Sequence, residues 1–435
     1  MVPNARPSFR LRAGLTGYVD RVMSDSGDAP MPAVGFIALL RLREYRFLWL
    51  ADVQSLLGDQ LARVALSVLV YDRTRSALVT AVVYALSFLP ALVGSVLLGP
   101  LADRLPRRSV LVGGDLIRAA LLGLMTLPNM PVPVLGALLV LVVLVATPWS
   151  AAESALVVDV LTARDYALGI GLRAATGQAA QVAGFAVGGI TVAALGARGA
   201  LALDTATFLI SAMIIRLGVR YRPAASKSQK SESHVSQRWL AGTTVVLRNR
   251  QLRLLLALSW LLGLLVVPEG LAAPYAQLFE GTPRTVGLLL AAGPAGVLLG
   301  TVLYSRWLSA STRTALLGPL AAVAGLPLLA CAATPGLALT CLLWALSGAC
   351  TAYQVQVVTE FVGTIDPSIR GQGISIAAAG LLAAQGVGLL AGGLITQVAT
   401  PATAVATAGG AATVLGSALA LARRRQHKQL LPPVG

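Results

Sequence analysis

The feature that most constrains this chain is a series of twelve long apolar runs, separated by short breaks rich in Gly, Pro or charged residues. A helix needs about 20 apolar residues to cross the hydrocarbon core of a bilayer. Because a helix satisfies its backbone hydrogen bonds internally, runs of this length favour transmembrane helices. We therefore predict an all-α integral membrane protein. The expected spans are residues 45–71, 76–99, 109–128, 132–157, 168–195, 198–218, 251–275, 285–306, 313–331, 336–361, 371–396 and 402–422.

Composition supports the membrane class and argues against other classes. Hydrophobic residues make up 56% of the chain and charged residues 12%, whereas a soluble domain has about 25% charged residues. The net charge of +16 does not indicate a nucleic-acid partner, because the basic residues lie in short loops and tails between apolar runs. Cys331, Cys341 and Cys350 lie inside apolar runs without metal-ligand spacing, so we expect neither a disulfide framework nor a metal site.

Basic residues are distributed unequally between the two sets of loops. One set holds Arg73, Arg75, Arg198 and Arg284. The other set and the C-terminal tail hold Arg104, Arg107, Arg108, Arg164, the segment 220–250, Arg306, Arg313, Arg370 and residues 423–425. Cytoplasmic loops carry an excess of Lys and Arg. The bias therefore predicts that both termini are cytoplasmic, which requires an even number of spans.

A polar, Ser-rich break divides the chain into two parts of similar length. Residues 221–250 form this break, and we predict that they are a flexible cytoplasmic linker. The linker joins two six-helix halves, residues 41–220 and 251–422. Residues 1–40 mix Arg, Pro, Gly, Ser and Asp without periodicity, so we expect a disordered cytoplasmic tail there. A second cytoplasmic tail is expected at residues 423–435.

The two halves share a pattern in their penultimate helices. Gln181–Gly189 reads QVAGFAVGG, and Gln385–Gly393 reads QGVGLLAGG. Such repeats are expected where two halves are related by an axis along the membrane normal, with the substrate site between them. We interpret the glycines of the repeat as positions of close helix packing. They are Gly184, Gly188, Gly189, Gly388, Gly392 and Gly393.

The loop Gly99–Arg108 places four charged residues and two prolines between two apolar runs. Its pattern, Gly-x-Leu-Ala-Asp-Arg-x-x-Arg-Arg, resembles the cytoplasmic loop between the second and third helices of major facilitator superfamily transporters. The segments Glu44–Asp59 and Leu203–Phe208 are similar to the enterobactin-exporter and macrolide-efflux branch of that superfamily. The resemblance implies the major facilitator fold, with twelve transmembrane helices in two six-helix halves.

The same resemblance implies a function. It implies secondary-active export, by alternating access, of a hydrophobic or amphiphilic small molecule such as a drug, an antibiotic or a siderophore-like compound. Proton antiport, a monomer in the lipid of a bacterial cytoplasmic membrane, and no cofactor are implied with it. Drug–proton antiporters often carry Gly-Pro-x-x-Gly-Gly in the fifth helix. Here Phe185 takes the place of that proline, which weakens the inference of proton coupling.

The loop Gly99–Arg108 also has an expected mechanical role. In the family the acid, here Asp103, resembles a latch that holds the halves together when the carrier opens outward. Gly99, Asp103, Arg104, Arg107 and Arg108 are the residues of this predicted latch. The alternative is that the arginines only anchor the topology and contact anionic lipid. The corresponding loop of the second half has a tyrosine in place of the acid.

Charged residues inside the spans are candidates for proton coupling or substrate binding, because such groups are costly in a bilayer and mark transport paths. Asp59 and Arg63 are spaced for an ion pair within one helix, so Asp59 is either a proton or cation site gated by Arg63, or half of a permanent structural bridge. Asp52 is expected to be solvated. Glu153 is expected to face a cavity, and Glu269 follows a proline that breaks its helix.

Four polar residues inside the spans are candidates for lining a cavity: Gln178, Gln181, Tyr353 and Gln354. They could bind substrate or form hydrogen bonds between helices. Two other functions stay open, an importer or uniporter of a small metabolite and a transport-dead receptor or scaffold. An enzyme is not expected. The chain has no Gly-x-x-x-x-Gly-Lys-Ser/Thr loop, which argues against an ATP-driven pump.

Overall fold

The computed structural model describes residues 34–99, 101–223 and 244–430. The helices of the N-terminal half are α2 (Val34–Arg41), α3 (Arg43–Thr74), α4 (Ala77–Ala85), α5 (Leu89–Leu97), α6 (Leu101–Arg104), α7 (Arg107–Met125), α8 (Val132–Val160) and α9 (Ala163–Gly218). Those of the C-terminal half are α11 (Arg250–Trp260), α12 (Leu262–Leu265), α13 (Val267–Gly270), α14 (Ala272–Ala276), η1 (Gln277–Phe279), α15 (Pro283–Trp307), α16 (Ala310–Val323), α17 (Leu326–Leu329), η2 (Ala330–Ala333), α18 (Leu337–Cys350), α19 (Tyr353–Thr364), α20 (Arg370–Ile395) and α21 (Pro401–Leu430).

These helices make twelve crossings of membrane-spanning length. Ten helical stretches are long and apolar enough to span a bilayer. One of them holds two crossings, because Gly196, with φ of 71°, separates α9 into two arms. The twelfth crossing is α7, whose four charged residues lower its hydropathy. The predicted fold, all-α with twelve transmembrane helices in two six-helix halves, is confirmed.

The segments outside the crossings differ in part from the prediction. Residues 34–41 form α2, although residues 34–40 belong to the segment predicted as a disordered tail. Leu39 of α2 is buried against Tyr45 of α3. The last crossing continues into the predicted C-terminal tail, because α21 extends to Leu430. Most of the predicted linker lies outside the described residues. Its described end, residues 244–248, is helical.

The seventh crossing is the most broken one. It consists of α11, α12, α13 and α14, which meet at non-ideal turns around Leu261, Val266 and Leu271. Pro268 and Pro274 lie within this stretch. Proline lacks a backbone N–H and clashes with the preceding turn, so the sequence itself breaks the helix here. Broken backbone at membrane depth is tolerated where it is buried or lines a cavity.

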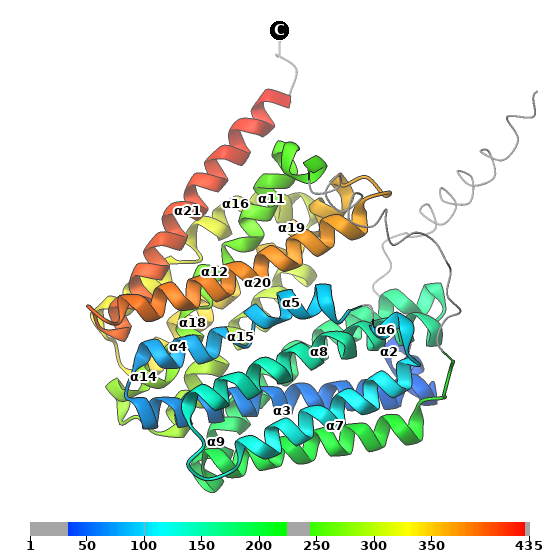
Figure 1. Ribbon diagram of the computed structural model, residues 1–435. Helices are drawn as coiled ribbons and strands as arrows, with labels where there is room; N and C mark the ends of the chain where they lie inside the picture. The colour runs from blue at the N-terminus through cyan, green and yellow to red at the C-terminus, as the bar shows by residue number, and fades with distance from the viewer. Residues whose placement is uncertain (1–33, 100, 224–243, 431–435) are drawn as a thin grey trace, which may run out of the picture.

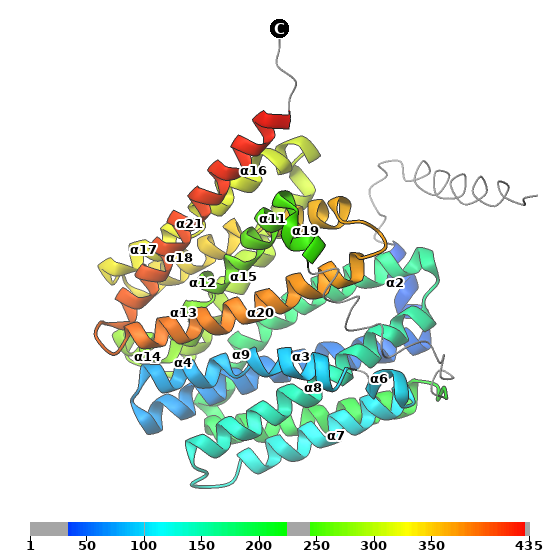
Figure 2. The same cartoon turned by 45° about the horizontal axis from the view of Figure 1, so that its top comes forward.

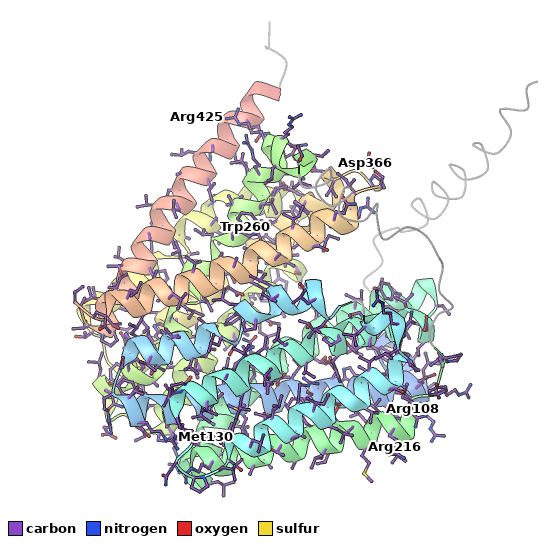
Figure 3. All side chains as sticks on the ribbon, in the orientation of Figure 1. Arg108, Met130, Arg216, Trp260, Asp366 and Arg425 are labelled. Atoms are coloured by element: carbon purple, nitrogen blue, oxygen red, sulfur yellow. The ribbon has the colours of Figure 1, made fainter. Side chains whose placement is uncertain are left out.

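The two halves converge at one end of the bundle and diverge at the other (Figures 1 and 2). Figure 3 places Arg108 and Arg216 of the N-terminal half and Asp366 of the C-terminal half on the side where the halves diverge. We call this side the basic end. Met130 marks the side where they converge, which we call the opposite end. Helices α4 and α14 lie at the convergent side (Figure 1), so the halves separate toward the basic end.

Glycines of the sequence repeat lie at equivalent places in the two halves. In the N-terminal half, a Cβ at Gly184 would lie 2.8 Å from the Cβ of Gln60 in α3. In the C-terminal half, a Cβ at Gly388 would overlap the carbonyl oxygen of Gly263 in α12. Each penultimate helix therefore packs its glycines against the first crossing of its own half. Small residues allow helix backbones to approach this closely in a membrane.

The last glycine of each repeat instead faces the other half. A Cβ at Gly189 in α9 would lie 2.8 Å from the Cα of Gly287 in α15. Likewise, a Cβ at Gly393 in α20 would lie 2.8 Å from the Cβ of Ala81 in α4. The contact between the halves thus repeats the symmetry of the sequence, and both of its glycine positions lie toward the opposite end.

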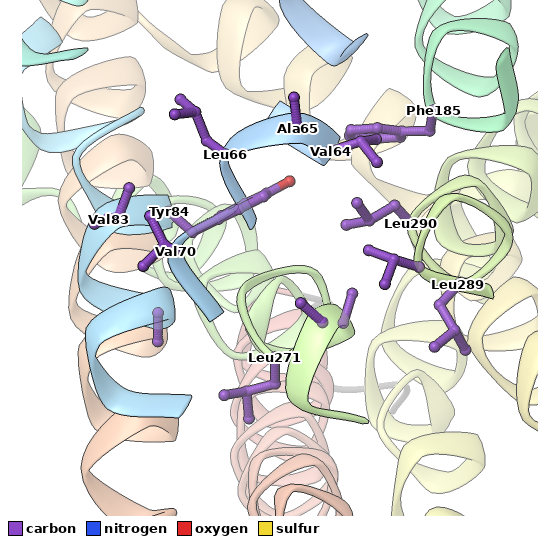
Figure 4. Close-up of a cluster of buried hydrophobic side chains, with 14 of the residues drawn as sticks. Val64, Ala65, Leu66, Val70, Val83, Tyr84, Phe185, Leu271, Leu289 and Leu290 are labelled. Atoms are coloured by element: carbon purple, nitrogen blue, oxygen red, sulfur yellow. The ribbon is translucent and has the colours of Figure 1, made fainter. Parts of the chain in front are cut away.

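A buried apolar cluster fills the space between the halves at that end. Figure 4 shows Val64 of α3, Tyr84 of α4 and Phe185 of α9 beside Leu271, Leu289 and Leu290 of the C-terminal half. Phe185 and Leu289 have no exposed surface. The cluster closes the bundle toward the opposite end, and it fixes where a cavity between the halves can lie.

Candidate functional site

A cavity of about 290 Å³ lies between the halves, next to this apolar cluster. Its wall comes mostly from the C-terminal half, whose α12, α13, α15, α18 and α19 all contribute residues. The N-terminal half contributes Gln178 and Gln181 of α9. Leu289 and Leu290 belong both to this wall and to the apolar cluster, so the cluster is the floor of the cavity on the opposite-end side.

Three of the four predicted cavity residues lie in this wall, and the fourth lies outside it. Gln178, Gln181 and Gln354 line the cavity. Tyr353 does not, because its side chain is fully buried in the C-terminal half and its Oη donates to the carbonyl oxygen of Leu258 at 3.0 Å. Adjacent helical residues point about 100° apart, so Gln354 can face the cavity while Tyr353 faces the neighbouring helix. The prediction for Tyr353 is wrong.

Most of the remaining wall residues were not predicted, and two of them carry large or polar side chains of particular interest. Trp344 of α18 supplies an aromatic surface, and Gln385 of α20 supplies an amide. A signal for Gln385 was present in the sequence, because it holds the same place in the second repeat as Gln181 in the first. The two repeats therefore face one cavity from opposite halves, each with a glutamine.

Glu269 is the only charged residue in the described wall of this cavity. It lies in the broken seventh crossing, where α13 is a single short turn. Tyr84 Oη of α4 donates to Glu269 Oε2 at 2.8 Å, and this hydrogen bond joins the two halves. The predicted coupling candidate therefore sits both on the cavity and on the contact between the halves.

Arg63 does not form the predicted ion pair with Asp59. Its guanidinium lies over the ring of Phe88, 5.3 Å from the ring centroid. It acts electrostatically on both Asp59 and Glu269, without a contact of salt-bridge length to either in the described structure. Helical spacing brings positions 59 and 63 onto one face, but cation–π contact with Phe88 competes for the arginine. Arg63 thus lies between two acids rather than bound to one.

Glu153 and Asp52 share a partner that was not predicted. Arg173 of α9 forms an ion pair with Glu153 of α8, and its Nε donates to Asp52 Oδ2 of α3 at 3.2 Å. Asp52 is only 3% exposed, so the expectation that it is solvated is wrong. The three side chains line a separate small cavity of about 60 Å³. Glu153 therefore faces this cavity and not the one between the halves.

A second buried cluster centres on Arg118 of α7. Its Nη2 donates to Asp115 Oδ1 at 2.5 Å, and Ser211 Oγ of α9 donates to Asp115 Oδ2 at 2.7 Å. The guanidinium also lies 4.2 Å from the ring centroid of Phe208 and 5.0 Å from that of Trp149. Sequence reasoning missed this pair, although the i, i+3 spacing of two opposite charges inside a predicted span was a usable signal.

Two residues of the predicted latch, Arg107 and Arg108, make contacts within their own half. Arg107 pairs with Asp159 at the end of α8, and its Nη1 donates to the carbonyl oxygen of Ala155 at 3.1 Å. Arg108 donates to the carbonyl oxygen of Arg216. Gly99 precedes α6, which carries Arg104 at its end. The side chain of Asp103 lies outside the described residues, so the latch stays a prediction.

The same end of the bundle holds two local charge arrangements. Glu44 at the start of α3 accepts hydrogen bonds from Arg222 at 2.5 and 3.0 Å and from the backbone N–H of Arg220 at 2.9 Å. The hydrogen bond to Glu44 raises the pKa of Arg222. In the C-terminal half, hydrogen bonds from Ser368 lower the pKa of the exposed Asp366. The contact with Glu44 fixes the start of the predicted linker to the first crossing.

Comparisons with known proteins indicate the same fold as the sequence and the structure do. The family model of the Major Facilitator Superfamily matches residues 48–272. No curated protein matches the chain in sequence. The fold is similar to that of a bacterial homolog of the human lysosomal transporter Spinster in an inward-facing, unoccupied conformation. That match has 15% identity and a TM-score of 0.65, over 90% of this chain and 99% of that chain.

Two other solved structures show the same fold. A peptide transporter of the POT family in complex with sulfate matches at 15% identity and a TM-score of 0.66, over 88% of this chain and 94% of that chain. A variant of the nucleoside transporter NupG matches at 18% identity and a TM-score of 0.65, over 86% of this chain and 98% of that chain. At these identities the likeness shows the arrangement of helices and leaves substrate and direction open.

Proposed function

Because the chain belongs to the major facilitator superfamily and is a multi-pass membrane transporter, we propose that it exports a hydrophobic or amphiphilic small molecule in exchange for protons. The observation that carries this proposal is the cavity between the halves, with a single carboxyl group, that of Glu269, in its described wall. That carboxyl group also takes part in the contact between the halves. One group can therefore respond to protons, substrate and conformation.

The chemistry of the wall favours an amphiphilic substrate. Leu262, Leu265, Leu289 and Trp344 give it extended apolar surface. Gln178, Gln181, Gln354 and Gln385 supply amide groups that donate and accept hydrogen bonds. Sites of this type bind an apolar body by burial and orient it with a few polar contacts. This is the combination expected of a drug, an antibiotic or a siderophore-like compound, the class to which the branch resemblance also points.

We propose that the basic end faces the cytoplasm of a bacterial cell. The excess of arginines at that end supports this orientation through the positive-inside rule, and it places both termini in the cytoplasm. The halves diverge toward the same end (Figure 2). Substrate therefore enters the cavity from the cytoplasm, and the predicted latch around Asp103 closes this end when the carrier opens to the other side.

Coupling at Glu269 follows from its contacts. The carboxylate accepts the hydrogen bond from Tyr84 and lies in the field of Arg63, so ionisation strengthens the contact between the halves at the opposite end. A proton on Glu269 weakens this contact and lets the opposite end open. Protonation and substrate binding then bias one conformational equilibrium, and each changes the affinity for the other by the same factor.

The test is transport in everted membrane vesicles, with ethidium as the first amphiphilic probe and uncharged and anionic fluorescent amphiphiles in parallel. We expect Glu269→Gln to reduce accumulation driven by a pH gradient by about 5- to 150-fold, the range of a typical coupling free energy. Exchange of labelled for unlabelled probe without a gradient should persist. Glu280→Gln, an exposed acid just beyond the same crossing, is the matched control.

Three outcomes would contradict parts of the proposal. Unchanged accumulation in Glu269→Gln removes Glu269 as the coupling group. Accumulation only under a reversed gradient identifies an importer, and equilibration without accumulation identifies a uniporter. No flux of any probe class in the wild-type protein favours the receptor or scaffold alternative.

A further inference from the structure

Three polar residues of the cavity wall lie on one face of the crossing formed by α18 and α19. They are Ser347 of α18, Thr351 at the end of that helix and Gln354 of α19. Spacings of four and three residues bring side chains to the same face of a helix. The three residues therefore present a line of polar atoms to any molecule that binds in the cavity between the halves.

The two hydroxyl groups of this line have already used their hydrogens. Ser347 Oγ donates to the carbonyl oxygen of Ala324 at 2.8 Å. Thr351 Oγ1 donates to the carbonyl oxygen of Gly348 at 2.6 Å. A carbonyl oxygen only accepts, and a hydroxyl group has a single hydrogen, so both hydroxyl oxygens are left as acceptors. Both bonds are buried, and turning either hydroxyl group toward a ligand would take the donor from its carbonyl group.

The amide of Gln354 is committed in the same way. Its Nε2 donates to the carbonyl oxygens of Leu258 at 3.1 Å and Ser259 at 3.3 Å, in the last turn of α11. Because both neighbours only accept, the nitrogen and not the oxygen of the amide must face them. Its Oε1 has no hydrogen bond in the described structure and is left as an acceptor. We call Ser347, Thr351 and Gln354 the acceptor line.

Other polar groups of the wall do not share this property. Among the described hydrogen bonds, none involves Gln178, Gln181 or Gln385, so these amides can donate as well as accept. Trp344 adds an aromatic ring to the wall, but its Nε1 is itself buried. The cavity therefore has one edge, the acceptor line, that offers a ligand hydrogen-bond acceptors and no free donor.

We propose that the acceptor line selects substrates that carry hydrogen-bond donors, hydroxyl or N–H groups, along one edge of an apolar body. This names the substrate class of the cavity and rests on the proposed function. Neighbouring acceptors lie about one turn of helix apart, roughly 5–6 Å along the axis, so donors at a similar spacing fit best. A molecule that lacks these donors leaves buried acceptors unpaired, and sites built to bind a donor reject such analogues.

The experiment measures equilibrium binding of fluorescent amphiphiles to the purified full-length protein in lipid nanodiscs, with empty nanodiscs to correct for partition into lipid. Ethidium, whose amino groups supply N–H donors, is compared with its fully N-methylated analogue, which keeps the charge and lacks the donors. Pyrenebutanol is compared with its methyl ether, which tests the same property without a charge. We expect the donor-bearing member of each pair to bind about 5- to 150-fold more tightly, the factor that corresponds to an unpaired buried acceptor.

Variants of the acceptor line locate the effect. Thr351→Val nearly keeps the shape of the side chain and removes the hydroxyl group, and Gln354→Met removes the amide. Each should reduce the preference for the donor-bearing probe about 5-fold or more and change the affinity for the methylated analogue little. Thr359→Val is the matched control. Thr359 Oγ1 makes the same kind of bond, to the carbonyl oxygen of Val355 at 2.8 Å, but this residue is exposed and lies outside the cavity wall.

Several results would overturn the acceptor line. They are equal affinity within both probe pairs, tighter binding of the methylated analogues, and no binding of either donor-bearing probe. A preference that survives in both Thr351→Val and Gln354→Met would also overturn it, since other groups would then recognise the donors. If a variant does not give folded protein, the comparison of probe pairs in the wild type decides. Binding needs no gradient, so a failure of export contradicts only the proposed function.

Discussion

The two halves pack by the same plan but bury different chemistry. In both, the penultimate helix lays glycines against the first crossing of its half and a last glycine against the other half. The described part of the N-terminal half also buries five charged residues, Asp52, Asp115, Arg118, Glu153 and Asp204. Among its described residues, the C-terminal half buries Thr285, Thr340, Ser347 and Thr351 as polar residues and no charged one.

This difference gives the two halves different shares of the cavity and of the buried charge. The apolar half supplies most of the cavity wall, and the charged half supplies only two glutamines to it. The charged half instead holds its ions between its own helices. The shared backbone plan therefore accounts for how the halves fit together. The unshared side chains place most of the cavity wall in one half and the buried charges in the other.

The largest loss of stability is expected when a buried charge is removed from the N-terminal half. Arg118→Ala should lower the free energy of unfolding by about 3–5 kcal/mol, because it leaves Asp115 buried without its ion-pair partner. The measurement is the temperature at which the detergent-solubilised protein loses its monodisperse elution peak. We expect a clear fall in that temperature.

The matched change in the C-terminal half is Arg423→Ala. Arg423 Nη2 contacts Glu360 Oε1 at 2.8 Å, but both side chains are partly exposed. Such pairs contribute about 0–1 kcal/mol, so the elution profile should shift little. Equal losses in the two variants would show that the charged interior of the first half adds nothing special to its stability.

A smaller effect is expected from adding a methyl group at equivalent repeat positions. Gly388→Ala should cost about 1–3 kcal/mol by overpacking, because the new Cβ meets the rigid carbonyl of Gly263. Gly184→Ala should cost less, since its nearest neighbour is the side chain of Gln60. Gly371→Ala, whose Cβ would meet nothing within 4 Å, is the control in the same helix as Gly388. The same thermal assay ranks the three, and a reversed order would contradict the packing described.

The mildest change tests the bond that joins the halves. Tyr84→Phe removes the hydrogen-bond donor to Glu269. It should weaken the association of the halves at the opposite end by about 1 kcal/mol, the usual net contribution of one hydrogen bond. The variant should populate the conformation open at the opposite end several-fold more. Spin labels near Arg75 and Glu280 would report this as a longer distance between the two sites. No change in the distance distribution would remove this hydrogen bond as a gate.

The fold was predictable because the bilayer imposes long apolar runs, and these could be counted. The boundary between the fifth and sixth crossings was visible as Gly196 and its neighbours, although α9 passes through it without a loop. The helix at Val34 could not be predicted from periodicity, since its contacts come from Tyr45 and from the end of α8. Tertiary packing determines whether such a short segment is helical.

The site was only partly predictable, because spacing along one helix does not show which helix lies opposite. Glu269 stood out by its proline and its charge. Arg63 was assigned to Asp59 because both lie on α3, whereas the ring that binds it comes from the next helix. Arg173 was missed for the same reason, since its two acids belong to α3 and α8. Ion pairs between segments that are far apart in the sequence can be identified only when the positions of the helices in the bundle are known.

The crossing of α9 and α15 at Gly189 and Gly287 has a kinetic consequence. Neither residue has a side chain, so backbone lies directly on backbone where α9 and α15 cross. Interlocked leucines at such a pivot would have to leave one set of rotamers and enter another with every change of angle. At this one contact the two helices can change their angle without a change of rotamer. The side chains that must repack between the halves are those of the neighbouring apolar cluster, such as Phe185 and Leu289.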